Sequence, residues 1–254
     1  MSLNLKRKKL IREGKPIEAL GLTFYPILME HYDEFQTYKS VLSIRLGTLP
    51  IKYATMDYFS AIYAISNEKD TDMIGVLFVL LCLSLRIEAN EKNIHIYGDD
   101  KITKFSVKQD EKTVEITPWE FSTIIRPLIA EQNGVELPDE SENIELVKDM
   151  EEMNALKNRN TKTVPDTDAL ISSVAYLSNV REREILTWTI REFENRFSAI
   201  QRDKMFTLYK QAEMSGMVEF KNGNPYETWC YDTKDEIYNS GSINTVLKAV
   251  SEKN

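Results

Sequence analysis

The chain has little of the chemistry from which most catalytic sites are built. Its 254 residues include two cysteines and two histidines, and neither His31 nor His95 has a cysteine or a second histidine at metal-ligand spacing. Two cysteines in a chain this long make no disulfide framework, which fits a reducing compartment. The nine glycines form neither G-x-x-x-x-G-K-S/T nor G-x-G-x-x-G, and there is no G-x-S-x-G turn. We expect no metal, no cofactor and no catalytic residues, although a triad assembled by folding would leave no such pattern.

Long apolar runs are also missing. The run Met73–Leu85 is almost wholly apolar but has only 13 residues, whereas a helix that spans a bilayer needs about 20. We interpret it as a buried core helix and expect no membrane contact. The basic start of the chain is followed by polar residues rather than an apolar stretch, so we expect no signal peptide.

Negative charge prevails, but unevenly. The net charge is -8, yet residues 1–16 hold six cationic side chains against one carboxylate, so this arm carries +5 and the remainder -13. An acidic body is a poor platform for phosphate backbones. We expect the arm to be a flexible, solvated terminus, with contact to nucleic acid, membrane or an acidic partner as the alternatives.

Apolar spacings of three and four predict helices along most of the chain. After a short extended segment near Leu20–Ile27, an amphipathic helix is expected over residues 31–46 and a second helical stretch from Pro50. Asp70 or Thr71 is expected to cap the buried helix.

The period then changes to two over residues 93–117, where apolar residues such as Ile94 and Ile96 alternate with polar ones. With turn signals between them, these residues predict a three-stranded antiparallel meander whose apolar face packs on the helices. Thr117-Pro118-Trp119-Glu120 then predicts a capping box, and the helix that it starts should run to Gln132 and kink at Arg126-Pro127.

The sequence therefore predicts an α+β fold, predominantly α-helical, with a small three-stranded antiparallel meander. The predicted organisation is a basic flexible arm (1–16), a helical subdomain with the meander (17–134), a charged linker region with a charged helix near 143–158 (135–167), a helical subdomain with a C-terminal cap (168–235) and a tail (236–254).

Two short helices around Ser178-Asn179-Val180 resemble a helix-turn-helix, and Arg181 and Arg183 follow the break. Glutamates interleave with these arginines and would face phosphates. An ordinary packed helix pair is therefore favoured, and DNA reading by Arg181 and Arg183 is an alternative.

The last predicted helix is capped by Thr189, runs to Ser215 and ends at Gly216. Asn222-Gly223 then predicts a tight turn, followed by an aromatic group. We favour a cap that folds back on the helix. The alternative is a surface that binds a partner, and its candidate residues are Tyr226, Trp229, Tyr231, Met214 and Met217.

Two stretches carry a resemblance to known proteins. They are DEFQTYKSVLSIRLGTLPIKYATMDYFSAIYAI, which follows Tyr32, and the C-terminal set SVAYLSNV, WTIREFENRF and LYKQAEMSGMVEFKNGNPYETWCYD. Over most of residues 20–232 the chain resembles proteins in the structural modules of tailed bacteriophages and prophages. The resemblance implies a part in virion or tail morphogenesis, like that of a tail-assembly chaperone, and it implies no catalytic residues.

We therefore expect a non-enzymatic protein of the host bacterial cytoplasm or the virion, which binds tape-measure or tail-tube proteins or associates with itself. A structural virion component is one alternative. A DNA-binding regulator that uses residues 168–188 and the basic arm is another, against which the acidic body argues.

Overall fold

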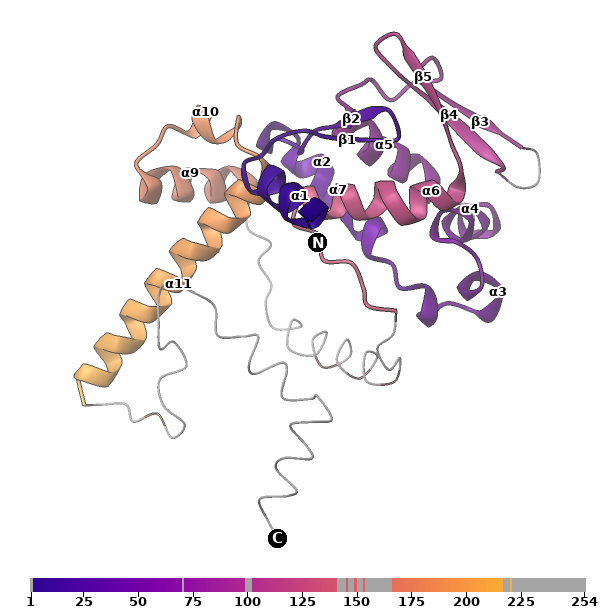
Figure 1. Cartoon of the computed structure of the whole chain (residues 1–254). Coiled ribbons are helices and arrows are strands. Elements are labelled where there is room, and N and C mark those ends of the chain that lie inside the picture. Colours follow the sequence, from indigo (N-terminus) through magenta and orange to yellow (C-terminus); the bar gives the residue numbers. More distant parts are fainter. Residues whose placement is uncertain are drawn as a thin grey trace. The chain divides into compact units, whose positions relative to one another are not determined.

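The computed structural model describes residues 2–69, 71–98, 102–140, 145, 149, 153, 166–216 and 220 (Figure 1). The chain divides into two compact units, residues 1–193 and residues 194–254. This division falls inside the last helix, whereas the sequence predicted a boundary within residues 135–167. The predicted charged helix near 143–158 lies outside the described residues, apart from three isolated positions.

The described part is mostly helical with two small antiparallel sheets, so the predicted α+β fold is confirmed. The elements are α1 (Ser2–Arg12), β1 (Ile17–Ala19), β2 (Leu22–Phe24), α2 (Tyr32–Tyr38), α3 (Ile51–Ala54), α4 (Tyr58–Lys69), α5 (Met73–Leu85), β3 (Ile94–Tyr97), β4 (Lys104–Gln109), β5 (Lys112–Ile116), α6 (Pro118–Glu120), α7 (Arg126–Gln132), α9 (Thr167–Ser178), α10 (Glu182–Ile185) and α11 (Ile190–Met214). Short 3₁₀ turns cover Met29–His31, Lys39–Ser43 and Leu46–Thr48.

The basic arm is a helix in the structure, which corrects the prediction of a flexible terminus. Ser2–Arg12 forms α1, and the side chain of Ile11 is only 6% exposed. The Arg7 guanidinium lies 2.7 Å from a carboxylate oxygen of Glu131 on α7. The buried apolar side chain and the ion pair give the helix the tertiary contacts that so short a helix needs.

The extended segment after the arm is a hairpin, which sequence reasoning missed. Its register pairs Ile17 with Phe24 and Ala19 with Leu22. The two connecting residues, Leu20 and Gly21, have φ values of 52° and 79°, as the two-residue turn with both φ positive requires. Leucine is rare at a turn position with positive φ, so the residues Leu20-Gly21 do not form a pattern that predicts this turn.

The helix predicted over residues 31–46 is broken after α2, where a 3₁₀ turn begins at Lys39. Side chains from other elements take the carbonyl oxygens that a longer helix would use. The Tyr58 hydroxyl donates to the Val41 carbonyl, and Arg126 Nε donates to the Leu42 carbonyl at 2.8 Å. Tertiary hydrogen bonds thus override the local helical periodicity.

The apolar run Met73–Leu85 is the predicted core helix, α5, and seven of its side chains are buried. Its cap is Asp72, whose carboxylate accepts a hydrogen bond from the Gly75 N–H at 3.1 Å. The predicted caps were Asp70, which lies outside the described residues, and Thr71. Thr71 instead donates its N–H to the Ser66 carbonyl at 3.1 Å, so it belongs to the end of α4.

The meander is present, with strand order β3-β4-β5 and both pairs antiparallel (Figure 1). Its apolar face packs on the helices, as predicted, through a cluster of four buried rings. Phe105 of β4 stacks on Phe59 of α4 at 5.1 Å between ring centroids, and Phe59 meets Phe121 edge-on at 5.0 Å. Phe78 of α5 completes the cluster, 5.3 Å from Phe105. One expectation fails: Ile96, on the edge strand β3, is 46% exposed.

The helix after the meander begins with the predicted capping box, in which the Thr117 and Glu120 side chains each bond the other's backbone N–H. It ends at Gln132 as predicted. Just before Arg126-Pro127, where the sequence predicted a kink, the helix has a π-helical turn over Phe121–Ile125. Such a turn shifts the hydrogen-bond ladder, and this accommodates Pro127, which has no N–H to donate.

Backbone hydrogen bonds join two segments that lie far apart in the sequence. The Met29 N–H donates to the Trp188 carbonyl at 2.9 Å, and the Ile190 N–H donates to the Ile27 carbonyl at 3.0 Å. Leu28 and Thr189 form a β-bridge between these bonds. α9, α10 and the first turn of α11 therefore belong to the same unit as the meander.

The second unit is described mainly by the rest of α11. Gly216, with φ of 67°, follows the helix as predicted. The Phe220 ring lies 5.4 Å from the Tyr209 ring, so the chain returns to the last turns of α11 at this residue. The predicted turn at Asn222-Gly223 and the aromatic group after it lie outside the described residues.

Candidate binding surfaces

The described part of the chain holds no cluster of three histidine, cysteine or acidic side chains that could bind a metal ion. No helix in that part is long and apolar enough to cross a membrane.

Only one of the five predicted partner-binding residues can be placed. Met214 ends α11 and is 85% exposed. Met217, Tyr226, Trp229 and Tyr231 lie outside the described residues.

The predicted helix pair around Asn179 forms with Asn179 in the left-handed conformation, at φ of 56°. The second helix, α10, has only four residues, with Arg181 at its N-cap and Arg183 inside it. Both arginines are exposed, and so are Glu182 and Glu184 beside them. A recognition helix must reach several bases in the major groove, and α10 is little more than one turn, so this geometry favours the packed helix pair.

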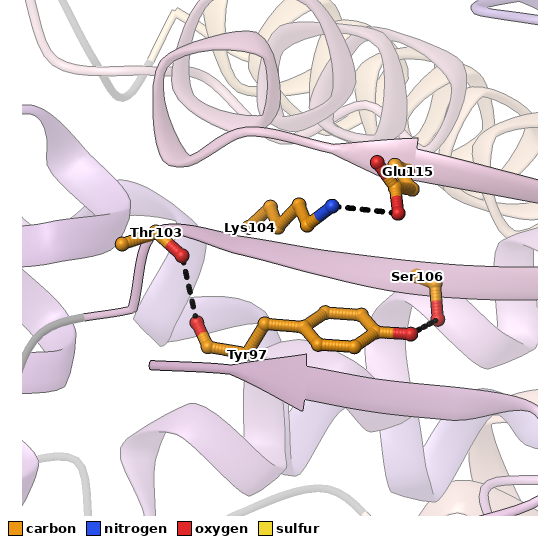
Figure 2. Close-up of polar contacts among 5 residues, drawn as sticks. All are labelled: Tyr97, Thr103, Lys104, Ser106 and Glu115. Carbon is orange, nitrogen blue, oxygen red and sulfur yellow. Dashed lines mark hydrogen bonds and ion pairs between the residues drawn. The ribbon is translucent and has the colours of Figure 1, made fainter. Parts of the chain in front are cut away.

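The outer face of the meander carries polar side chains that bond one another across the strands (Figure 2). Lys104 Nζ lies 2.7 Å from a carboxylate oxygen of Glu115 and 5.2 Å from the centroid of the Tyr97 ring. The Tyr97 hydroxyl lies 3.4 Å from Ser106 Oγ, and the Thr103 hydroxyl donates to the Tyr97 carbonyl at 3.2 Å. These side chains satisfy one another across the strands, so we interpret the face as stabilising the sheet.

A buried cation joins α4, α7 and the 3₁₀ turn at Lys39–Ser43. The Arg126 guanidinium stacks 3.5 Å from the centroid of the Tyr58 ring. Burial raises the pKa of Tyr58 to about 12 and lowers the pKa of Arg126. Among the described residues, Arg126 Nη2 has no hydrogen-bond partner. Because Arg126 is buried and holds the Leu42 carbonyl, we interpret it as a structural residue.

A groove of about 1090 Å³ lies between α1, the β1–β2 hairpin and the helix that contains α7. We call it the α1 groove. Its apolar lining consists of Leu10, Pro16, Ile17, Ala19, Ile124, Pro127 and Leu128. Lys6, Arg7 and Lys8 line it from α1. Sequence reasoning missed this groove because it treated the arm as flexible, although Leu10 and Ile11 within the basic run were a sign of an amphipathic helix.

α11 presents a second surface. Ile190 and Phe193 are its only buried residues, and none of the 21 helix residues after Phe193 is buried. Even so, apolar side chains follow its 3.6-residue period on one side, and they are Phe197, Ile200, Met205, Leu208 and Ala212. Leu208 is 58% exposed. We call this set the α11 stripe.

No protein-family model, no curated protein and no solved structure matches the chain.

Proposed function

We propose that the chain is a non-enzymatic component of a tailed-bacteriophage or prophage morphogenesis set, which acts in tail assembly by binding another protein in the manner of a chaperone. The observation that carries the proposal is the α11 stripe. Three of its five residues, Phe197, Leu208 and Ala212, belong to the C-terminal segments that resemble phage and prophage proteins.

α11 is long, and one side of it is apolar. A 25-residue helix with an apolar side owes most of its stability in water to what that side packs against. Here the stripe beyond Phe193 is only partly covered, and Leu208 has more than half of its surface in solvent. An exposed apolar strip with polar neighbours is typical of a surface that binds protein.

The mode of binding that fits this surface is a helix laid into a groove of the partner, with anchors spaced by three or four residues. Tape-measure and tail-tube proteins are the partners that we propose. A chaperone of this kind would hold such a protein until it is incorporated into the tail.

The test is co-expression of the tagged chain with tail-tube and tape-measure proteins, followed by affinity capture. Leu208→Glu places a charge in the α11 stripe, and we expect it to weaken capture by about tenfold or more. Asn195→Glu places the same charge at an exposed position on another side of the same helix, and it should leave capture unchanged. Failure of the unaltered chain to capture either protein would sink the proposal.

Mass spectrometry of purified particles separates the chaperone from the structural component. A chaperone is present in lysates during assembly and absent from finished particles. Presence at a fixed ratio to the tail-tube protein would assign the chain to the virion instead.

A further inference from the structure

We propose that the α1 groove binds an acidic amphipathic peptide segment of a partner protein. This inference goes beyond the proposed function because it concerns another surface, and it does not depend on the α11 stripe. It rests on the shape and lining of the groove and on the charge of α1.

The lining of the α1 groove is largely apolar. Leu128 is buried, and the side chains of Leu10, Ile17 and Ile124 are each partly exposed. A groove of about 1090 Å³ has room for several apolar side chains of a bound segment. Partly exposed leucine and isoleucine side chains gain from losing their remaining contact with water.

The cationic side chains of α1 set a second condition on the ligand. α1 carries five cationic side chains and no carboxylate. Arg7 is neutralised by its ion pair with Glu131, but in the described structure Lys6 and Lys8 are exposed at the groove and form no ion pair. Glu18 is the one carboxylate at the groove besides Glu131. The cationic edge therefore favours a ligand with carboxylates beside its apolar side chains.

An acidic amphipathic peptide meets both conditions, whereas a nucleic acid meets only one. Phosphates would pair with Lys6 and Lys8, but they would leave the apolar lining uncovered. The remainder of the chain, at -13, would also repel a long polyanion. A short peptide would contact only the groove and its cationic edge, and would not extend over the negatively charged remainder of the chain.

The test uses the full chain and two fluorescein-labelled peptides, measured by fluorescence anisotropy. The first peptide places leucines on one helical face and glutamates on the other, and the second has lysines in place of the glutamates. We expect saturable binding of the glutamate peptide, weakened by added salt, and at least about tenfold weaker binding of the lysine peptide.

Matched variants then locate the binding. Lys6→Glu with Lys8→Glu should weaken binding of the glutamate peptide by about tenfold. Lys9→Glu with Arg12→Glu changes the net charge of α1 equally, outside the groove lining, and should change affinity by less than about twofold. Ile124→Ser leaves the charge unchanged and should weaken binding several-fold because it removes apolar contact. Circular dichroism and urea unfolding establish that each variant is folded.

Four outcomes would overturn the inference: no saturable binding, equal binding of both peptides, equal loss in the two charge variants, or full affinity in Ile124→Ser. The last two would mean general attraction to a basic helix. Sedimentation analysis provides a fifth: self-association that Lys6→Glu with Lys8→Glu abolishes would assign the groove to a second copy of the chain.

Discussion

Single buried polar side chains hold together segments that are far apart in this sequence. Gln109, at the end of β4, accepts a hydrogen bond from the Thr23 N–H and donates to the carbonyls of Thr23 and Leu85, with all three distances between 2.8 and 2.9 Å. Asn133 accepts from the Ile27 N–H and donates to the Ile129 carbonyl, both at 2.8 Å. Each residue thus links backbone groups of separate segments, and Asn133 in particular pairs the Ile27 N–H, which is buried.

Asn133→Ala should therefore lower the free energy of unfolding by about 2 kcal/mol, because it leaves the Ile27 N–H buried and unpaired. Urea denaturation followed by circular dichroism measures the change. Asn195→Ala, at an exposed position on α11, is the control and should change stability by less than about 0.5 kcal/mol. Equal effects of the two substitutions would contradict the role assigned to Asn133.

Cys82 is predicted to be chemically inert in the folded protein. Its side chain is buried in α5, and burial raises the pKa of the thiol to about 11 from an ordinary value of 9.0. The raised pKa means that the thiolate, which is the reactive form, is about a hundredfold scarcer near pH 8 than for a free thiol. In a Cys230→Ser background, a disulfide reagent should react slowly with the native chain and rapidly in urea. Rapid reaction of the native chain would contradict this placement of Cys82.

At the scale of elements, the sequence predicted those that depend on local signals. The sequence correctly predicted α5, the meander and the capping box at Thr117. Each of these depends on residues that are neighbours in the sequence. The elements that depend on distant contacts were not: the break after α2 depends on Tyr58 and Arg126, and α1 depends on Glu131 and its buried Ile11. The α1 groove was missed for the same reason.

The capping box involves only neighbouring residues, so its loss should lower stability by no more than one helix cap contributes. Thr117→Ala removes the side chain that accepts the Glu120 N–H at 3.2 Å, and it should lower the free energy of unfolding by about 1 kcal/mol. Thr123→Ala, at an exposed position in the same helix, should lower it by less than about 0.5 kcal/mol. Equal losses in urea denaturation would show that the cap adds nothing.

At the scale of the molecule, every buried apolar side chain among the described residues lies at or before Phe193. That observation predicts that the first unit folds without the second. A chain that ends at Ile200, two turns beyond Phe193, should unfold in one cooperative transition with nearly the midpoint of the full chain. Calorimetry measures this directly. Loss of the transition would mean that the second unit is needed for the core to form.

The central claim is that the chain assists tail assembly by binding, with α11 as a binding surface. Deletion of its gene from the inducible prophage or phage that encodes it, followed by electron microscopy of the particles, tests this claim most directly. The account predicts heads without normal tails, restored by the unaltered chain and by Asn195→Glu but not by Leu208→Glu. Normal tails and undiminished infectious titre after the deletion would contradict it.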